Sequence, residues 1–507
     1  MEYLLAHDVG TSGCKAVLMG TDGQVVATAR KAYETNFSKS LWAEQDPNDW
    51  WDALATTTRA VLEQSSVTPD QVLSLSFSTQ MVNIIPVDRE GKPLRPCINW
   101  LDGRAWEEAK AATAKFGGPR LFTALFGATI TGKDLIPKYL WLKKHEPDVY
   151  RRSAAFVDVS GYLVQHATGK LIYEWTSASV TGLFDFKAKS WDSTALRVFG
   201  LEREKFPELV QPTQQVGGLT AVAARELGLL EGTPVFAGAG DVLSGEVGSG
   251  AVGEGDGHIY LGTSGFVGIV TSRWMKGRQG VYFLQSPDPQ KYLMLAETET
   301  AGACLVWAAK ELYGREPDAE TMAMMDAEVE KTAAGSGNLL FTPWMYGERC
   351  PVPDESVRAS FINLSCDISR RQMTRAIYEG IAYNLRWMMD LIYDLNGLRP
   401  DSMRVMGGGA KGLPWLQIIS DVTGRTLETV PHLQSASAVG AGLLAAVGLG
   451  LYPSVEATKG LIPVAQVIRP DASSKGVYDN LYAAYRTIYG SLKNLHKRLN
   501  QAKTGEA

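Results

Sequence analysis

The chain has 507 residues, of which 45% are hydrophobic and 21% charged, and its formal net charge is −5. This composition is ordinary for a globular protein, and the length suits two or more domains. The mildly negative charge gives no reason to expect nucleic acid or an anionic membrane as a partner.

The cysteines and histidines indicate neither a disulfide framework nor a metal site. The five cysteines are widely spaced and form no Cys-x-x-Cys pair, which is typical of reduced thiols in a cytoplasmic protein. The six histidines are scattered, so their spacing indicates no zinc site. The N-terminus starts on an apolar run that contains Asp8 and shows no signal-peptide pattern. We therefore expect a cytoplasmic protein.

The first half of the chain alternates between strand and helix patterns. The predicted elements are a hairpin and a third strand within 1–30, a helix over 49–64, strands over 72–77 and 84–87, mainly helices over 105–150, and a strand with a helix from 153. A further apolar strand over 234–237 runs into a glycine-rich turn that ends at Asp241. This pattern places Asp241 at a carboxyl strand end, where functional groups of open α/β sheets gather.

The glycine-dense segment 248–257 separates two halves of the chain. Its first residues match a dinucleotide-binding fingerprint, but the segment follows no clear strand and opens no helix. We therefore interpret it as a linker between domains of residues 1–250 and 251–507. The second half is predicted to contain helices over 300–312, 369–395, 413–422 and 478–498 and a strand over 403–406.

The uncharged stretch 433–455 could be mistaken for a membrane span. It contains several glycines and serines and Pro453, with few large apolar side chains. A membrane span should be predominantly apolar over about 20 residues. We predict a small-residue helix over 435–449 inside a domain core.

A Gly-Thr-Ser-Gly pattern occurs twice, at residues 10–13 and 262–265, each time between two apolar runs. This arrangement predicts a strand, a tight turn and a second strand. Glycines let the backbone approach a ligand, and free amides with Thr and Ser hydroxyls suit phosphate oxygens. One copy alone would be an ordinary hairpin turn, whereas two copies favour a pair of turns that hold a nucleotide triphosphate.

Three charged residues near these turns suit phosphoryl transfer, which needs charge neutralisation and a base for the incoming hydroxyl. Asp8 is a candidate to hold Mg²⁺ through water, Lys15 to reach a phosphate, and Asp241 to accept the substrate proton. Each also has a purely structural interpretation: an Asx turn for Asp8, a solvated strand position for Lys15 and a helix N-cap for Asp241.

Trp100, Asp102 and Arg104 combine an aromatic wall with a carboxylate and a guanidinium. Sugars are bound by such sets, because carboxylates accept hydroxyl protons and flat rings cover C–H faces. The alternative is that Asp102 caps a helix that starts near Ala105. Both interpretations can hold together.

Together these motifs resemble the FGGY family of carbohydrate kinases, within the fold of actin, hexokinase and the heat-shock-70 ATPases. The resemblance covers nearly the whole chain and keeps the family's motif order. Matching segments are the first phosphate loop at 8–15, sugar-binding segments at 80–81 and 100–104, the catalytic-base segment at 238–241, the second phosphate loop at 262–265, the adenosine loop at 407–410 and further signatures at 347–349 and 376–380. Residues 42–47, with Trp50 and Trp51, resemble a segment of xylulokinases.

The resemblance implies an α/β fold with two ribonuclease-H-like domains and an active-site cleft between them. It implies ATP and Mg²⁺ as reactants, Asp241 as general base and Asp8 as the residue near the metal. The implied substrate-binding residues are Gln80, Met81, Trp100, Asp102, Arg104 and Asp241. The implied ATP-binding residues are Gly10, Thr11, Ser12, Lys15, Gly262, Thr263, Ser264, Gly408, Gly409 and Ala410. Because family members are often dimers, a homodimer is also expected.

The chain departs from the xylulokinase pattern in the expected sugar site. Xylulokinases carry His and Gly after Gln-Met, where this chain has Val82 and Asn83, and Asn after the catalytic Asp, where it has Val242. Lost donors should change or relax specificity. Val242 and the segment 360–365 are more similar to autoinducer-2 kinases. D-xylulose stays the first substrate to expect, with another polyol, gluconate or an autoinducer-2-type molecule as alternatives. A nucleotide-gated binding protein or chaperone is the alternative from a different class.

Overall fold

The computed structural model describes residues 2–118, 121–123 and 130–500. The chain forms two compact units that are each discontinuous in sequence. Unit 1 comprises Met1–Val252, Leu284–Leu293 and Ser435–Ile462, and unit 2 comprises Gly253–Phe283, Met294–Gln434 and Pro463–Ala507. The division after Val252 falls within the glycine-dense segment, and a late stretch of chain returns to unit 1.

A seven-stranded mixed sheet forms the centre of unit 1, in the order β13-β14-β5-β1-β2-β3 with β15 beside β5. β1 pairs antiparallel with β2 and parallel with β5, so the predicted hairpin is confirmed. The strands are β1 (Tyr3–Val9), β2 (Gly13–Gly20), β3 (Val25–Ala32), β5 (Val72–Thr79), β13 (Gln215–Gly218), β14 (Pro234–Phe236) and β15 (Ala239–Gly240). Since β1, β5 and β15 run parallel, their carboxyl ends lie at one sheet edge.

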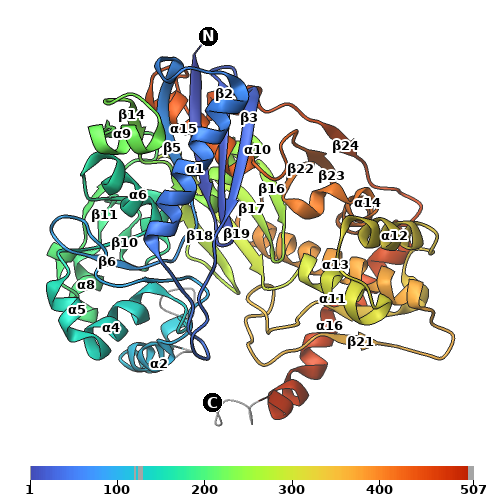
Figure 1. Cartoon of the computed structure of the whole chain (residues 1–507). Helices are drawn as coiled ribbons and strands as arrows, with labels where there is room; N and C mark the ends of the chain where they lie inside the picture. Colours follow the sequence, from blue (N-terminus) through green and yellow to red (C-terminus); the bar gives the residue numbers. More distant parts are fainter. Residues whose placement is uncertain (1, 119–120, 124–129, 501–507) are drawn as a thin grey trace. The chain divides into compact units, whose positions relative to one another are not determined.

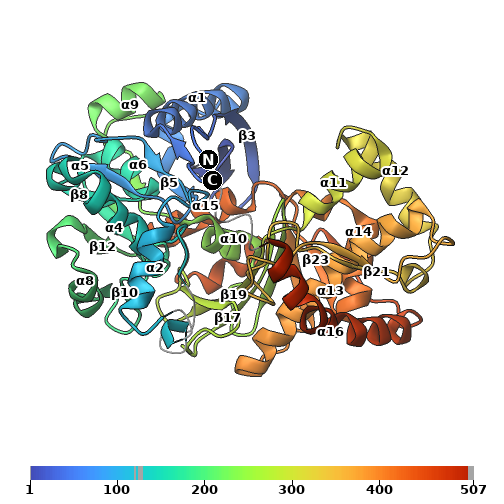
Figure 2. The ribbon, with the colours of Figure 1, turned by 90° about the horizontal axis from the view of Figure 1, so that it is seen from below.

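Helices cover both faces of this sheet. Leu5 and Val9 pack in one hydrophobic cluster with Trp50 and Leu54 of α1 (Pro47–Ser65). On the other face, Met19 lies against α15 (Ala436–Gly448). Figures 1 and 2 show α1 and α15 on opposite sides of the sheet. Successive side chains of a strand therefore pack into two separate layers, one on each face of the sheet, as expected for a sheet buried on both faces.

The predicted small-residue helix is confirmed as α15, and it packs closely on α10 (Asp241–Ser249). A Cβ atom added to Gly440 would lie 1.9 Å from the Ser244 carbonyl oxygen, and one added to Gly248 would lie 1.8 Å from the Ala436 carbonyl oxygen. The interpretation of residues 248–253 as a linker is therefore partly wrong. Gly248 closes the last turn of α10, because only a residue without a side chain lets the two helices approach so closely.

The remaining elements of unit 1 pack either against the first hydrophobic cluster or around a second one that is rich in aromatic side chains. They are β4 (Glu44–Gln45), β6 (Ile85–Val87), β7 (Cys97–Ile98), α2 (Trp106–Ala114), α4 (Leu135–His145), α5 (Pro147–Arg152), β8 (Ala155–Val157), α6 (Val159–Thr168), β9 (Ile172–Glu174), α7 (Trp175–Ser179), β10 (Phe184–Asp185), β11 (Ser190–Trp191), α8 (Ser193–Phe199), β12 (Glu208–Val210) and α9 (Ala221–Leu227). The predicted helical stretch over 105–150 is confirmed for α2, α4 and α5. Residues 119–120 and 124–129 lie outside the described part of the chain.

The second seven-stranded sheet has the order β18-β19-β17-β16-β22-β23-β24. As in unit 1, its first strand pairs antiparallel with the second and parallel with a strand far along the chain. The strands are β16 (Gly257–Leu261), β17 (Gly265–Thr271), β18 (Val281–Gln285), β19 (Tyr292–Thr298), β22 (Ser402–Met406), β23 (Thr426–Thr429) and β24 (Gln466–Ile468). The repeated Gly-Thr-Ser-Gly pattern thus marks the same turn in two related α/β sheets.

Helices follow the sheet strands of unit 2 along the chain. They are α11 (Gly302–Tyr313), α12 (Ala319–Glu330), α13 (Arg370–Asn396), α14 (Leu413–Thr423) and α16 (Lys475–Asn500), and a short pair, β20 (Leu340–Thr342) with β21 (Ser360–Ile362), lies outside the main sheet. A capping box of Ser369 and Gln372 starts α13, and Gly397 ends it in the left-handed conformation. The four predicted helices are confirmed.

Within the described residues, no helix combines the length and apolarity that a membrane crossing requires.

Because His258 in β16 is buried, we expect the fold to be sensitive to acid. Its side chain is fully buried, and burial lowers its pKa to about 4. The unfolded chain binds this proton near pH 6.5, so the stability contributed by neutral His258 is present above pH 6.5 and is lost as the pH falls toward 4. The loss amounts to about 3 kcal/mol. His258→Phe should therefore flatten the fall in unfolding free energy between pH 7 and pH 5, measured in urea.

The matched control is His432→Phe, because His432 is exposed. This control should change the slope of stability against pH far less than His258→Phe does. An unaltered slope in His258→Phe would contradict the prediction.

Candidate active site

The first glycine turn joins β1 to β2. The Gly10 amide donates to the Gly13 carbonyl oxygen at 3.1 Å. A Cβ atom on Gly13 would lie 2.6 Å from the Lys31 carbonyl oxygen, so no larger residue fits there. Thr11 is half-buried and Ser12 is exposed. The tip of the turn therefore offers a hydroxyl and backbone amides to a ligand, as the phosphate interpretation requires.

Asp8 and Lys15 are direct neighbours across the hairpin. Lys15 Nζ lies 3.7 Å from Asp8 Oδ2, and Ser78 Oγ donates to Asp8 Oδ1 at 3.0 Å. Burial raises the pKa of Asp8, while Lys15 and Ser78 favour its ionised form. Asp8 therefore belongs to a strand and not to an Asx turn. No cluster of three or more His, Cys, Asp or Glu suited to a metal occurs among the described residues. A lone carboxylate still fits Mg²⁺, which nucleotide sites hold mainly through phosphates and water.

A buried amide network connects the first turn to the predicted sugar-binding residues. Gln80 Nε2 donates to Gln45 Oε1 at 2.7 Å, and Asn99 Nδ2 donates to Gln80 Oε1 at 3.0 Å. Gln45 Nε2 donates to the Thr11 carbonyl oxygen at 2.7 Å, and Trp100 Nε1 donates to Thr11 Oγ1 at 2.8 Å. The structure thus brings Gln80, Trp100 and Thr11 together. Sequence reasoning missed Gln45 and Asn99, although each lies in or beside a motif that it noted.

Val82 and Asn83, which depart from the xylulokinase pattern, form a tight turn. Asn83 Nδ2 donates to the carbonyl oxygens of Gln80 and Met81, each at 3.0 Å, and the Trp100 amide donates to Asn83 Oδ1 at 3.1 Å. Val82 has φ of 61°, a left-handed conformation that is strained for a β-branched residue. Asn83 therefore shapes the turn and fixes the start of the Trp100 segment.

Lys138 stabilises this turn through hydrogen bonds to backbone carbonyl groups. Its side chain is fully buried, and Nζ donates to the carbonyl oxygens of Asn99 at 2.8 Å and Val82 at 3.3 Å. Burial lowers the pKa of Lys138 to about 8. Sequence reasoning missed Lys138 because α4 carries no motif that signals such a role.

Asp102 and Arg104 bind chiefly to each other and to neighbouring protein groups. Asp102 accepts from the Ala43 amide at 2.6 Å, and Arg104 Nη2 lies 2.6 Å from Asp102 and 2.7 Å from Glu44. The guanidinium carbon of Arg104 lies 3.5 Å from the ring centroid of Trp42. The alternative that Asp102 caps a helix is wrong, because α2 starts at Trp106 without a side-chain cap.

Asp241 lies at the carboxyl edge of the sheet of unit 1. Gly240 pairs with Thr79, so Asp241 follows β15 where Gln80 follows β5. A Cβ atom on Gly240 would lie 2.4 Å from Met81 Sδ. Asp241 is half-buried, and its Oδ1 accepts from the Val242 amide at 2.9 Å. The N-cap of α10 is Gly240, so the cap interpretation of Asp241 is wrong.

In unit 2 the second glycine turn lies beside the glycine-rich turn 407–410. β16 and β22 run parallel, with Tyr260 opposite Met406. The Gly262 amide donates to the Ser264 carbonyl oxygen at 2.9 Å, while Thr263 is exposed. Gly407 has φ of 99°, and a Cβ atom there would lie 2.5 Å from the Leu261 carbonyl oxygen. This packing places Gly408, Gly409 and Ala410 next to the second turn.

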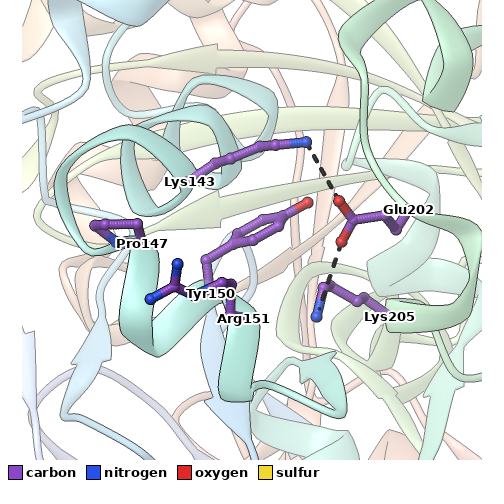
Figure 3. Close-up of a pocket in the computed structure, with 6 residues that line it drawn as sticks. All are labelled: Lys143, Pro147, Tyr150, Arg151, Glu202 and Lys205. Carbon is purple, nitrogen blue, oxygen red and sulfur yellow. Dashed lines mark hydrogen bonds and ion pairs between the residues drawn. The ribbon is translucent and has the colours of Figure 1, made fainter.

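A separate pocket of about 320 Å³ opens on unit 1 (Figure 3). Lys143 Nζ and Lys205 Nζ lie 3.3 and 3.8 Å from the Glu202 carboxylate. The lining residues are Lys143, Pro147, Tyr150, Arg151, Glu202 and Lys205. None of the predicted site residues is among them, and Glu202 forms ion pairs with two of the three cationic side chains of the pocket. This pocket is therefore distinct from the candidate active site.

Comparison with known proteins agrees with this geometry. Residues 3–248 match the N-terminal domain, and residues 257–449 the C-terminal domain, of the FGGY family of carbohydrate kinases. The chain is 30% identical over 491 residues to the xylulose kinase of Staphylococcus xylosus, which covers 96% of this chain and 100% of that protein. Ligand-bound xylulose kinase from Lactobacillus acidophilus superposes with a TM-score of 0.89 at 25% identity, covering 98% and 100%. Gluconate kinase from the same organism superposes with a TM-score of 0.90 at 25% identity, covering 98% and 99%.

The chain belongs to the FGGY family of carbohydrate kinases. It is an ATP-dependent sugar kinase, and its two α/β units have the actin/hexokinase-like ATPase fold. The resemblance drawn from the motifs is confirmed, and the binding-protein or chaperone alternative is set aside.

Proposed function

We propose that this kinase transfers the γ-phosphate of ATP to D-xylulose and forms D-xylulose 5-phosphate. The similarity to xylulose kinases in sequence and structure supports this substrate. The observation that supports this site most directly is that Asp241, Met81 and the hydrogen-bond network of Gln80 lie together at one edge of the sheet. Gln80, Met81 and Trp100 face the sugar in this proposal, and Asp102 with Arg104 fixes the Trp100 segment.

In the proposed reaction Asp241 acts as general base. Its carboxylate takes the proton from the sugar hydroxyl while the hydroxyl oxygen attacks the γ-phosphorus. The bond between the γ-phosphorus and the bridging oxygen breaks, and ADP leaves. Residues 1–250 supply the sugar site, the base and the first phosphate turn, and residues 251–507 supply the second phosphate turn and the adenosine site.

Asp8 is the proposed residue for Mg²⁺, whose charge would offset that of the phosphates. The phosphates themselves would be bound by Gly10, Thr11, Ser12 and Lys15 from the first turn. The second turn and the adenosine loop would contribute Gly262, Thr263, Ser264, Gly408, Gly409 and Ala410.

Gluconate is a second candidate substrate. The chain matches a gluconate kinase structure as well as it matches a xylulose kinase structure. Val82 and Val242 also place apolar groups where xylulokinases carry polar ones. Both observations concern specificity and leave the class of reaction unchanged.

A coupled assay of ADP release tests the substrate. The panel would contain pentuloses, hexuloses, polyols, gluconate and the autoinducer-2 precursor. We expect the highest kcat/KM with D-xylulose. A higher value with gluconate or the precursor would replace the proposed substrate, and ATP hydrolysis without any dependence on a sugar would refute the site.

A homodimer and a cytoplasmic location are further proposals. All five cysteines are free thiols, which agrees with a reducing compartment. Light scattering during size-exclusion chromatography would decide between a monomer and a dimer.

The hydrogen bond between Trp100 and Thr11 predicts that the Trp100 ring of the proposed sugar site is coupled to nucleotide binding. Trp100→Phe keeps an aromatic face but removes the donor to Thr11 Oγ1. One lost hydrogen bond of about 1 kcal/mol should raise the KM for ATP about fivefold. Steady-state kinetics with varied ATP would show this change. Trp106→Phe is the control, because Trp106 is 53% exposed, and an equal rise there would contradict the coupling.

A further inference from the structure

A buried chain of hydrogen bonds ends at the residue before Asp241. Glu174 and Thr176 are fully buried where β9 leads into α7. Thr176 Oγ1 lies 2.7 and 2.8 Å from the two carboxylate oxygens of Glu174. The Gly240 amide donates to the same Oγ1 at 2.8 Å, although Gly240 lies 64 residues further along the chain. These contacts connect a carboxylate outside the proposed catalytic set to the start of α10.

The direction of the bonds follows from the groups involved. An ionised carboxylate only accepts, so the Thr176 hydroxyl hydrogen points to Glu174. The lone pairs of Oγ1 are then available for the Gly240 amide. A hydroxyl that donates to a charged acceptor is also polarised, which strengthens the bond that it accepts. Glu174 thus orients the Thr176 hydroxyl so that Oγ1 accepts from the Gly240 amide.

Gly240 is restrained on two sides. Its amide is bound by Thr176, and Met81 Sδ would lie 2.4 Å from any Cβ atom at this position. Gly240 is the N-cap of α10 and Asp241 is the first residue of that helix. The backbone torsions that aim the Asp241 carboxylate therefore begin at an atom that Thr176 fixes. A displacement of about 1 Å in a reacting group can lower a rate 100-fold.

The surroundings of Glu174 determine the conditions for a test. Burial, with a contribution from the nearby Asp158 carboxylate, raises the pKa of Glu174 to about 7. Burial raises the pKa of the adjacent Tyr173 well above its ordinary value, and the charge of Glu174 raises it further. The Thr176 and Ser177 hydrogen bonds favour the ionised form of Glu174. Assays at pH 8 therefore examine the carboxylate form.

We propose that Thr176, oriented by Glu174, is a positioning residue that aims Asp241 at the sugar hydroxyl. This inference rests on the proposed role of Asp241 as general base. It assigns no contact with sugar or nucleotide to Thr176, which lies beneath the reacting groups.

The first test is Thr176→Val, which removes the hydroxyl at nearly constant volume. With the best sugar of the panel at pH 8, kcat should fall about 10- to 100-fold, while the KM for ATP changes less than twofold. Thr176→Ser restores the hydroxyl and should recover most of kcat. Glu174→Gln should give an intermediate loss of kcat. The amide of glutamine can also donate, so it disturbs the direction of the hydrogen bond with Thr176.

A matched control is Thr233→Val, another buried threonine of unit 1 whose hydroxyl donates to the Leu230 carbonyl oxygen. This variant should keep kcat within twofold. Equal losses in Thr176→Val and Thr233→Val would overturn the proposal, as would wild-type kcat in Thr176→Val. If Thr176→Val fails to fold, the comparison of Thr176→Ser with Glu174→Gln decides, and wild-type kcat in Glu174→Gln overturns the role of Glu174.

A double-mutant cycle separates this inference from the role of Asp241. If Thr176 acts through Asp241, Thr176→Val should lower kcat less than twofold further in an Asp241→Asn background. An undiminished further loss in that background would show that Thr176 acts elsewhere. Full activity of the single variant Asp241→Asn would instead refute the proposed base, and the two failures are therefore distinguishable.

Discussion

Asp241→Asn should lower kcat for sugar phosphorylation about 10³-fold, with little change in the binding of ATP or sugar. The size of the effect is that of a lost general base, because a neutral amide cannot take the hydroxyl proton. The substitution keeps the shape of the side chain, and an amide oxygen can still accept from the Val242 amide as Asp241 Oδ1 does at 2.9 Å. The start of α10 should therefore remain intact. Coupled ADP release gives kcat, and isothermal titration gives the two binding constants.

The control for this substitution is Asp192→Asn. Asp192 is the N-cap of α8 and accepts from the amides of Thr194 and Ala195. It shares the chemistry of the change but lies in no predicted site, so kcat should stay within twofold of wild type. More than a tenth of the wild-type activity in Asp241→Asn would contradict the assignment of the base.

Gly440→Ala should lower the free energy of unfolding by about 3 kcal/mol, a large effect for one methyl group. The added Cβ atom would lie 1.9 Å from the Ser244 carbonyl oxygen and 2.7 Å from the Gly248 amide nitrogen. Both obstacles are backbone atoms of α10, so no side-chain rotation can relieve the overlap. The helices must separate, and the separation opens the core of unit 1.

Gly490→Ala is the matched control, since Gly490 lies in α16 and a Cβ atom added there would meet no heavy atom of another element within 4 Å. In this helix interior, alanine should stabilise by up to about 1 kcal/mol. Urea unfolding of both variants measures the contrast. Equal stability would show that α10 and α15 tolerate a wider spacing. Because α10 begins at Asp241, Gly440→Ala should also reduce kcat.

Much of unit 1 and unit 2 is predictable because local patterns encode it. The apolar runs on both sides of the two Gly-Thr-Ser-Gly turns predict the duplicated hairpins, and a further strand pattern within 1–30 predicts β3. Asp241 at the end of an apolar strand is a local signal as well. The bounds of α13 follow from a cap at Ser369 and a left-handed glycine at Gly397.

The missed features depend on residues that are distant in the chain. Lys138 acts through carbonyl groups of Val82 and Asn99, and a carbonyl partner leaves no mark in a sequence. Thr176 has the same property toward the Gly240 amide. The contacts of Asp102 with the Ala43 amide and with Arg104 were likewise not predicted from the sequence. Packing, and not periodicity, also decides that Gly248 lies within α10.

The return of Ser435–Ile462 to unit 1 has a consequence for how the protein is made. Ribosomes release the chain from its N-terminus, and domains commonly fold as soon as they emerge. Here the sheet of β1, β2 and β5 lacks α15 on one face until residue 448 has emerged, although Val252 appeared long before. The nascent chain therefore carries an uncovered apolar layer through most of its synthesis. Chaperones that shield such surfaces during translation would meet this layer.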